Sequence, residues 1–291
     1  MGAWQCVLGH DLPFICLLFA WMGIPERHPC AASVTYNCGS GSMSHMQVGQ
    51  FPPSYHLVFE ALGFWVAFRL YLKLRKRDSL NLEKRLPILI GGMLGAAIGC
   101  KLFYWLENPV VFVQHLTDWQ MLLSGKSLVG ALVGGWIFIE LTKKIVRVKS
   151  ATGDSFVVPL AAGILVGRIG CFLSGFYDQT WGTPTDLPWG FDFGDGVRRH
   201  PNQLYEILFL TGFLACWPKL VKMQLQQGEL WKIFILAYLG FRFFVEFVKP
   251  VPHTYLGLDV EQITAICTYI YYAPYLMAKC APLKEAEADG S

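Results

Sequence analysis

The chain has 291 residues, of which 54% are apolar and only 15% are charged, and its formal net charge is +3. With a mean hydropathy of +0.39, this composition excludes an ordinary soluble domain and indicates an integral membrane protein with short loops. The small net charge gives no reason to expect a nucleic-acid partner.

Residues 1–50 differ from the rest of the chain and are expected to form an N-terminal extension of uncertain fate. An apolar run from Leu12 to Ile24 is too short to span a bilayer easily. It has the length of a signal-peptide core, but no Lys or Arg precedes it and no clear cleavage pattern follows it. The sequence leaves open whether this extension reflects the assigned start site or lies at the membrane interface.

Seven apolar segments follow, and each approaches the ~20 residues that a helix needs to cross a bilayer. They lie at residues 55–73, 87–106, 127–143, 155–175, 203–220, 230–249 and 258–278. The sequence therefore predicts an all-α integral membrane protein with about seven transmembrane helices. This seven-span domain is expected to cover residues 51–280, and residues 281–291 are expected to be a cytoplasmic tail.

Basic residues gather in alternate gaps between the predicted spans. They follow the first, third, fifth and seventh spans, at Lys73, Arg75, Lys76, Arg77, Lys84, Arg85, Lys143, Lys144, Arg147, Lys149, Lys219, Lys222, Lys279 and Lys284. By the positive-inside rule these gaps face the cytoplasm. The sequence thus predicts a multi-pass protein with its N-terminus outside and its C-terminus in the cytoplasm.

Charged residues within the predicted spans fall mostly in the outward halves, at Glu60, Lys101, Arg168, Glu206, Arg242 and Glu246. A charge at membrane depth costs about 2.5–3.5 kcal/mol on insertion scales and is tolerated where it faces the bundle interior, a cavity or a partner. This bias predicts a polar chamber that opens to the outer face. Structural ion pairs and side chains that reach the interface are the alternative.

The longest outward connection, residues 176–200, is expected to be a structured loop. Gly and Pro recur in it at high density, and Asp195-Gly196 between short alternating stretches is typical of a β-hairpin. Its aromatic residues suit the headgroup zone. A long ordered loop over a polar chamber favours a lid or a substrate-docking surface, although an aromatic loop without a substrate role is an alternative.

Two motifs flank this loop. Gly-Arg-Ile-Gly at residues 167–170 precedes it, and Arg-His-Pro-Asn-Gln-Leu-Tyr-Glu at residues 199–206 follows it. Pro201 belongs near a helix N-terminus, where backbone N–H groups, the helix dipole and a guanidinium attract an anion. The sixth span adds Arg242 and Glu246 on one helix face.

These motifs resemble those of the prolipoprotein diacylglyceryl transferases, seven-span bacterial enzymes that move the diacylglyceryl group of phosphatidylglycerol onto a lipoprotein cysteine. The resemblance runs from about residue 55 to 278 and depends most on residues 199–206. It implies a protein of the bacterial cytoplasmic (inner) membrane that releases glycerol phosphate. The implied partners are phosphatidylglycerol, a prolipoprotein signal peptide with an acceptor cysteine, and membrane lipid.

The chain departs from the family pattern at defined positions. Val129 stands where the family has a histidine, and Cys171 stands where the family has an asparagine after Gly-Arg-x-Gly. The family's Asn-Gly-Glu is replaced by Ser-Gly-Phe at residues 174–176. Two alternatives therefore stay open: a divergent transferase with another acceptor or phospholipid, and a non-enzymatic phospholipid-binding or transport protein.

The resemblance implies roles for the charged residues. The predicted catalytic residues are Arg168, Arg242, His200 and Glu246, and the predicted substrate-binding residues are Arg199, Gln203, Tyr205, Glu206, Lys101 and Glu60. The arginines would stabilise the leaving phosphate. The base for the thiol is left open among His200, His56 and a buried carboxylate at Glu246 or Glu206.

No metal and no cofactor are predicted. The nine cysteines form no CxxC pair, and the sequence has no Gly-rich nucleotide loop and no evident cluster of His, Cys and Asp ligands. Cys171 is a possible nucleophile, but packing in an apolar helix is the favoured interpretation.

Overall fold

The structure is a computed structural model that describes residues 54–75, 80–117, 122 and 125–279. The predicted N-terminal extension and C-terminal tail lie outside these residues. The main helices are α2 (Ser54–Leu74), α3 (Leu82–Glu107), α6 (Leu128–Ile145), α7 (Asp154–Ser174), α8 (Asn202–Lys222), α9 (Glu229–Val245) and α10 (Val260–Tyr271). The short elements are α4 (Pro109–Gln114), η2 (Gly175–Asp178), β1 (Phe191–Asp192), β2 (Arg198–Arg199) and η3 (Glu246–Val248).

Each predicted apolar segment overlaps one of the main helices, which confirms the mostly helical fold. Among the described residues, three helical stretches are long and apolar enough to cross a membrane by length and composition alone: Leu82–Glu107, Asp154–Asp178 and Asn202–Lys222. The prediction that all seven segments span the membrane stays a prediction.

The last two predicted segments are not continuous α-helices. The sixth changes at its end from α9 into the 3-10 helix η3. The seventh is interrupted by a turn at Tyr272, after which a helix resumes over residues 273–279. Pro274 accounts for this interruption, because its nitrogen carries no hydrogen to donate to the preceding turn.

Glycines let α3 and α6 pack backbone against backbone. A Cβ atom added at Gly99 would lie 2.3 Å from the carbonyl oxygen of Gly130, and one at Gly95 would lie 2.4 Å from that of Gly134. Small residues at close helix contacts are typical of membrane bundles. Elsewhere on α3, Ile90, Leu94 and Ile98 are 44–51% exposed and share a face at a spacing of four residues, as expected for contact with lipid tails.

The same close packing joins α2 to α7. A Cβ atom at Gly63 would lie 2.7 Å from the carbonyl oxygen of Gly163, and one at Gly170 would lie 2.4 Å from the Cβ of Phe59. The start of α2 is thereby held against the end of α7. This contact brings residues far apart in the sequence to one end of the bundle.

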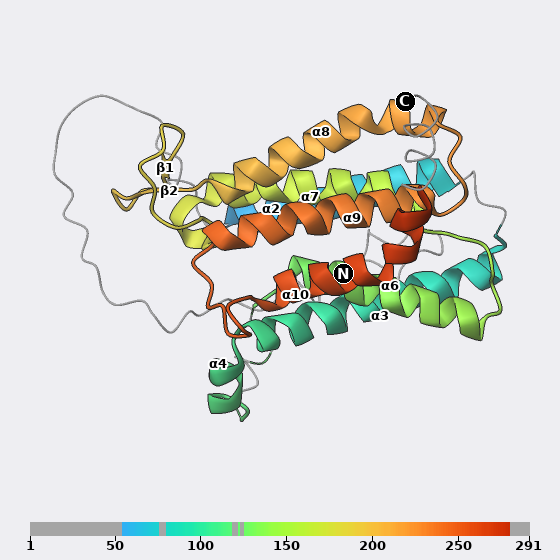
Figure 1. Cartoon of the computed structure of the whole chain (residues 1–291), viewed down its shortest axis with the longest axis horizontal. Coiled ribbons are helices and arrows are strands. Elements are labelled where there is room, and N and C mark those ends of the chain that lie inside the picture. The colour runs from blue at the N-terminus through green and yellow to red at the C-terminus, as the bar shows by residue number, and fades with distance from the viewer. Residues whose placement is uncertain (1–53, 76–79, 118–121, 123–124, 280–291) are drawn as a thin grey trace, which may run out of the picture.

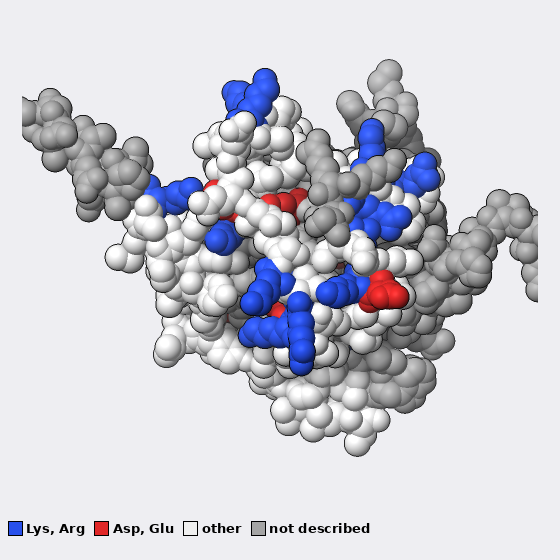
Figure 2. All heavy atoms as spheres, turned by 90° about the vertical axis from the view of Figure 1, so that its right-hand side faces the viewer, with Lys and Arg blue, Asp and Glu red and all other residues white. Residues whose placement is uncertain are grey.

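The two ends of the bundle differ in charge. Figure 1 shows α2, α7, α8 and α9 lying side by side, with the hairpin β1–β2 at one end, which we call the loop end. Figure 2 shows Lys and Arg side chains spread over the opposite end, which we call the basic end. Lysines in the last turns of α2, α6 and α8 belong to it: Lys73, Lys143, Lys144, Lys219 and Lys222.

The hairpin predicted from Asp195-Gly196 is confirmed. Strands β1 and β2 pair antiparallel, with Phe191 opposite Arg199. In the connection, Asp192 Oδ1 accepts hydrogen bonds from the backbone nitrogens of Gly194, Asp195 and Gly196. Gly194 and Gly196 have φ angles of 112° and 79°, which glycine adopts without a steric penalty.

Candidate functional site

A buried carboxylate at the loop end holds the two arginines that the sequence singled out. Glu206 Oε2, on α8, lies 2.8 Å from Arg168 Nε of α7 and 3.3 Å from Arg242 Nη1 of α9. Tyr238 donates its hydroxyl hydrogen to Glu206 Oε1 at 2.7 Å. Glu206 therefore ties three helices together.

Arg242 extends this arrangement toward α10. Its Nη2 contacts both Glu246 and Glu261. Lys249 Nζ lies 2.8 Å from Glu246 Oε1, and Ser127 donates to Glu261 Oε1 at 3.1 Å.

Three cations and three carboxylates therefore compensate one another in one network, which we call the buried ion network: Arg168, Arg242, Lys249, Glu206, Glu246 and Glu261. Such compensation is what makes charges tolerable in an interior.

Some polar groups in and beside this network keep unfilled hydrogen-bonding capacity. Among the described residues, the buried Nε atom of Arg242 has no hydrogen-bond acceptor, and the 2.8 Å contact of Arg168 Nε with Glu206 is an ion pair without a well-directed hydrogen bond. In the first turn of α8, Asn202 and the Oε1 atom of Gln203 are likewise buried and unfilled. Native proteins leave few such groups, and a ligand is one explanation for them.

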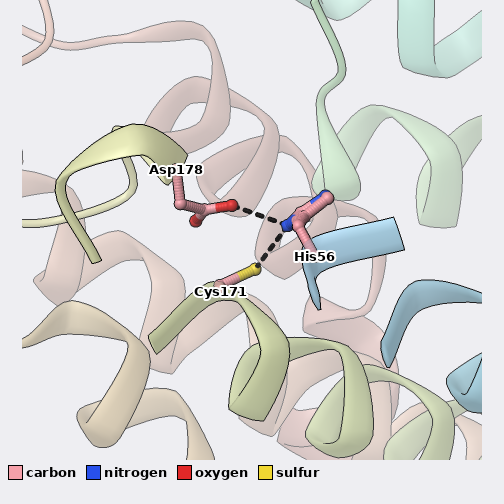
Figure 3. Close-up of side chains that lie close together, drawn as sticks. All are labelled: His56, Cys171 and Asp178. Carbon is pink, nitrogen blue, oxygen red and sulfur yellow. Dashed lines mark hydrogen bonds and ion pairs between the residues drawn. The ribbon is translucent and has the colours of Figure 1, made fainter. Parts of the chain in front are cut away.

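A second cluster lies beside Arg168 and consists of His56, Cys171 and Asp178, which we call the thiol cluster (Figure 3). His56 Nδ1 lies 2.7 Å from Asp178 Oδ1 and 3.8 Å from Cys171 Sγ. Arg168 Nη1 lies 3.9 Å from the same sulfur. These residues come from the start of α2, the end of α7 and η2, which the close packing of α2 on α7 brings together.

Further polar residues surround the thiol cluster. Glu60 Oε2 lies 3.7 Å from His56 Nε2, and Lys126 Nζ lies 3.2 Å from Glu60 Oε1. The Thr180 hydroxyl donates to Asp178 Oδ2 and accepts a 2.9 Å hydrogen bond from Gln203 Nε2. The cluster is thus joined to the first turn of α8 through Gln203.

The remaining predicted residues of the loop end contact the loop. Arg199 lies 4.4 Å above the ring of Trp181 and pairs with Asp195 at 2.6 Å. His200 Nδ1 lies 3.0 Å from the hydroxyl of Tyr205. Trp189 donates its indole hydrogen to that hydroxyl, also at 3.0 Å.

The structure thus divides the predicted site residues into groups. Arg168, Arg242, Glu206 and Glu246 meet in the buried ion network, as their common location in the outward half predicts. Glu60 and Gln203 join the thiol cluster, whereas Arg199, His200 and Tyr205 contact the loop. Lys101 donates to the carbonyl oxygen of Gly125 at 2.7 Å.

Two expectations need correction. Only four of the six charges predicted to line a polar chamber come together, namely Arg168, Arg242, Glu206 and Glu246. They are linked by a chain of ion pairs, because neutralisation by a neighbour lowers the cost of burial. Cys171 was expected to pack among apolar neighbours, but it lies within reach of His56 and Arg168. The end of α7 meets the polar start of α2 there, which a single helix cannot reveal.

Sequence reasoning missed Tyr238, Lys249, Glu261 and Asp178 as site residues. Tyr238 precedes Arg242 by four residues, so the helical spacing that linked Arg242 to Glu246 was a usable signal. Asp178 lies in the 3-10 helix η2, where no periodic pattern marks it.

Comparisons with known proteins place these residues in context. A family model described as prolipoprotein diacylglyceryl transferase matches residues 44–278. The phosphatidylglycerol–prolipoprotein diacylglyceryl transferase of Bordetella parapertussis is 34% identical over 194 residues, which are 64% of this chain and 70% of that protein. The protein of the same name from Solidesulfovibrio magneticus is 36% identical over 227 residues, which are 72% of this chain and 79% of that protein.

Proposed function

We propose, since the chain belongs to the prolipoprotein diacylglyceryl transferase family, that it transfers the diacylglyceryl group of phosphatidylglycerol to the thiol of a prolipoprotein cysteine and releases glycerol phosphate. The observation that carries this proposal is the pair of buried arginines that share Glu206, of which Arg242 keeps an unfilled Nε–H group. Guanidinium groups with spare donors suit a phosphate.

The protein lies in the bacterial inner membrane in this proposal, with seven spans, the basic end in the cytoplasm and the loop end outside. The lysines and arginines of the basic end support this orientation by the positive-inside rule (Figure 2). The N-terminus would then be outside and the C-terminus in the cytoplasm. Residues 51–280 would form the transferase domain.

Arg168 and Arg242 act on the leaving group. The thiolate sulfur of the acceptor attacks the terminal glyceryl carbon, a carbon–sulfur bond forms, and the carbon–oxygen bond to the phosphate breaks. The electron pair of the broken bond stays on the phosphate oxygen, where negative charge grows. Guanidinium groups that Glu206 already holds in place can stabilise this charge with little reorganisation.

Binding of the phosphodiester changes the charge balance of the buried ion network. The three cations and three carboxylates of the network neutralise one another, and the lipid phosphate brings one more negative charge. One carboxylate can respond by releasing its arginine to the phosphate or by taking up a proton. Glu246 and Glu261 share the Nη2 atom of Arg242, so one of them can leave while the other remains paired.

The other predicted residues act around this centre. Gln203 and Glu60 position the thiol cluster, through Thr180 and His56 respectively. Arg199 on the loop and Tyr205 in the first turn of α8 contact the lipid headgroup or the signal peptide. Lys101 holds the segment that precedes α6 through its hydrogen bond to the carbonyl oxygen of Gly125.

The test is a transfer assay with purified protein, phosphatidylglycerol and a lipoprotein-signal peptide, in which mass spectrometry detects a diacylglyceryl group added to the cysteine. Arg168→Ala is expected to lower the rate by about 10²–10³-fold, the usual loss when a donor to a developing oxyanion is removed. Arg69→Ala is the matched control, because Arg69 lies on α2 near the ring of Trp65 and outside the buried ion network. Equal rates for the two variants would exclude the phosphate role of Arg168.

A divergent acceptor or phospholipid is the second candidate function. Val129, which stands at the family's histidine position, is fully buried in the apolar core. The same assay with other anionic phospholipids and small thiols tests this candidate. Binding of phosphatidylglycerol without any adduct would instead favour a lipid-binding or transport protein.

A further inference from the structure

We propose that His56, Cys171 and Asp178 form a binding site for a divalent transition-metal cation, with Zn²⁺ as the best match (Figure 3). The binding itself is independent of the function proposed above, whereas the use of the ion rests on that function. The sequence predicted no metal because the three residues come from separate elements and show no ligand spacing.

The three ligand atoms converge on one point. The Nδ1, Sγ and carboxylate oxygen atoms all lie within 4.8 Å of one another, with separations of 3.8 Å from Nδ1 to Sγ and 2.7 Å from Nδ1 to Oδ1. Zinc bonds of about 2.0–2.3 Å place tetrahedral ligand atoms about 3.3–3.6 Å apart. Small side-chain movements are therefore enough to enclose an ion.

The geometry differs from that of a catalytic triad. In a triad the nucleophile and the carboxylate contact opposite ring nitrogens, so that the histidine can take a proton on one side while it is oriented from the other. Here Cys171 and Asp178 both face Nδ1 of His56. A nitrogen that donates to Asp178 cannot accept the thiol proton, whereas a central ion would use all three atoms at once.

Each ligand also has an outer partner of the kind that supports metal ligands. Glu60 lies 3.7 Å from Nε2 of His56, the nitrogen that keeps its hydrogen when Nδ1 binds a metal. Thr180 donates to the second oxygen of Asp178. Arg168 Nη1 lies 3.9 Å from the sulfur of Cys171.

Charge and access also fit a divalent cation. A thiolate and a carboxylate together carry the two negative charges that neutralise Zn²⁺, and thiolate, imidazole and carboxylate are all zinc ligands. The side chain of Asp178 is 4% exposed, but that of His56 is 33% exposed, so the cluster can be reached from the side of α2. Three protein ligands leave a fourth position for a substrate atom.

The fourth position would take the sulfur of the acceptor cysteine. A thiol that coordinates zinc loses its proton, which leaves to water, and the bound thiolate keeps the electron pair that attacks the glyceryl carbon. The carbon–oxygen bond then breaks toward the phosphate near Arg168. This arrangement supplies a thiolate without the histidine that Val129 replaces.

The test uses the full-length protein without a polyhistidine tag, purified in detergent, stripped with a chelator and titrated with Co²⁺ under reducing conditions. The expected result is one tightly bound ion, with a near-ultraviolet sulfur-to-cobalt charge-transfer band and the intense visible bands of tetrahedral cobalt. Cys171→Ser should lose the charge-transfer band. Cys267→Ser, which changes an exposed cysteine of α10, should keep it.

Substitutions at the other positions sharpen the test. Glu60→Gln should weaken Co²⁺ binding about 10–100-fold, as loss of an outer carboxylate does, and Asp178→Asn should weaken it more. Cys171→His should still bind Co²⁺ but without the sulfur band, which shows that a loss in Cys171→Ser is not caused by misfolding. Failure of the parent protein to bind Co²⁺, or an unchanged sulfur band in Cys171→Ser, would overturn the proposed site.

The transfer assay separates this inference from the proposed function. Transfer that needs restored Zn²⁺ after chelation supports both. Cobalt binding at Cys171 without any transfer retains the site and contradicts the function. Full transfer in a chelated protein that binds no cobalt contradicts the site and retains the function.

Discussion

The loop end and the basic end of the bundle both contain ion pairs, but the two ends differ in burial. At the loop end, the side chain of Arg242 is 3% exposed and contacts three carboxylates. At the basic end, Lys279 is 52% exposed and pairs with Glu229 at 2.9 Å. The lysine of this pair therefore reaches water or the headgroups, although its partner Glu229 is only 5% exposed.

The buried ion network is a different case. Desolvation of its charges offsets much of their mutual attraction, so apolar residues of similar volume would hold the helices together at least as well. The network is therefore better explained by what it binds than by the stability it contributes. The comparison predicts large effects of substitution at the loop end and small ones at the basic end.

Arg242→Ala is expected to have the largest effect. It leaves Glu246 and Glu261 buried without their arginine, and removal of one partner from a buried pair costs about 3–5 kcal/mol. Transfer should be abolished as well. Thermal unfolding in detergent and the mass-spectrometric transfer assay measure the two effects.

Arg242→Lys is the matched control for this loss. It keeps a cation but replaces the planar fork that contacts Glu206, Glu246 and Glu261 at once. Most of the stability should return while transfer stays low. An Arg242→Ala variant as stable as the parent would contradict the buried ion network as described.

The residues of the loop end also differ in how well the sequence predicted their positions. The positions of Arg168, Glu206 and Arg242 follow from helical segments and charge asymmetry, because each lies in the predicted outward half of an apolar helix. Their meeting in one network was therefore predictable, although their individual partners were not.

The thiol cluster was not predictable in this way. His56 and Cys171 meet because glycines bring α2 and α7 into backbone contact, and that contact depends on which helices are neighbours. Asp178 belongs to a 3-10 turn that carries no periodic pattern. Local patterns identify helices, but the partners of a helix are set by tertiary packing.

Tyr238→Phe is expected to have a smaller effect than loss of Arg242. It removes the 2.7 Å hydrogen bond to Glu206 but keeps the ring, and a hydrogen bond to a charged group contributes about 1.5–3 kcal/mol. Tyr269→Phe is the control, since its hydroxyl donates to the neutral carbonyl oxygen of Leu236 and should cost only about 0.5–1.5 kcal/mol. Unfolding midpoints in the same detergent compare the two, and a larger loss for Tyr269→Phe would reverse the argument.

Arg199→Ala should lower the free energy of unfolding by a smaller amount, about 0.5–2 kcal/mol. The reason is that the pair of Arg199 with Asp195 and its contact with Trp181 are only partly buried. Its effect on transfer should appear in KM and leave kcat nearly unchanged, since Arg199 contacts the loop and not the buried ion network. Arg199→Lys, which retains a cation near Trp181, should recover part of the KM. A loss confined to kcat would instead place Arg199 beside the reacting atoms.

Lys279→Ala at the basic end should have the smallest effect on stability. The pH dependence of this effect follows from the pKa shifts of Glu229 and Lys279, which lie outside the predicted spans. A hydrogen bond from Lys279 lowers the pKa of Glu229, and the same contact raises the pKa of Lys279. A lowered carboxyl pKa gives stability that is present above the unfolded value, about 4.3, and that is lost as the pH falls through the folded value. A raised lysine pKa gives stability that is present below about 10.4 and lost above it. The difference in Tm between parent and Lys279→Ala should therefore be small at neutral pH and should vanish as the pH falls below about 4. Lys222→Ala, which changes another lysine of the basic end, is the control variant. A difference that grows at acid pH would mean that the pair does not stabilise the basic end.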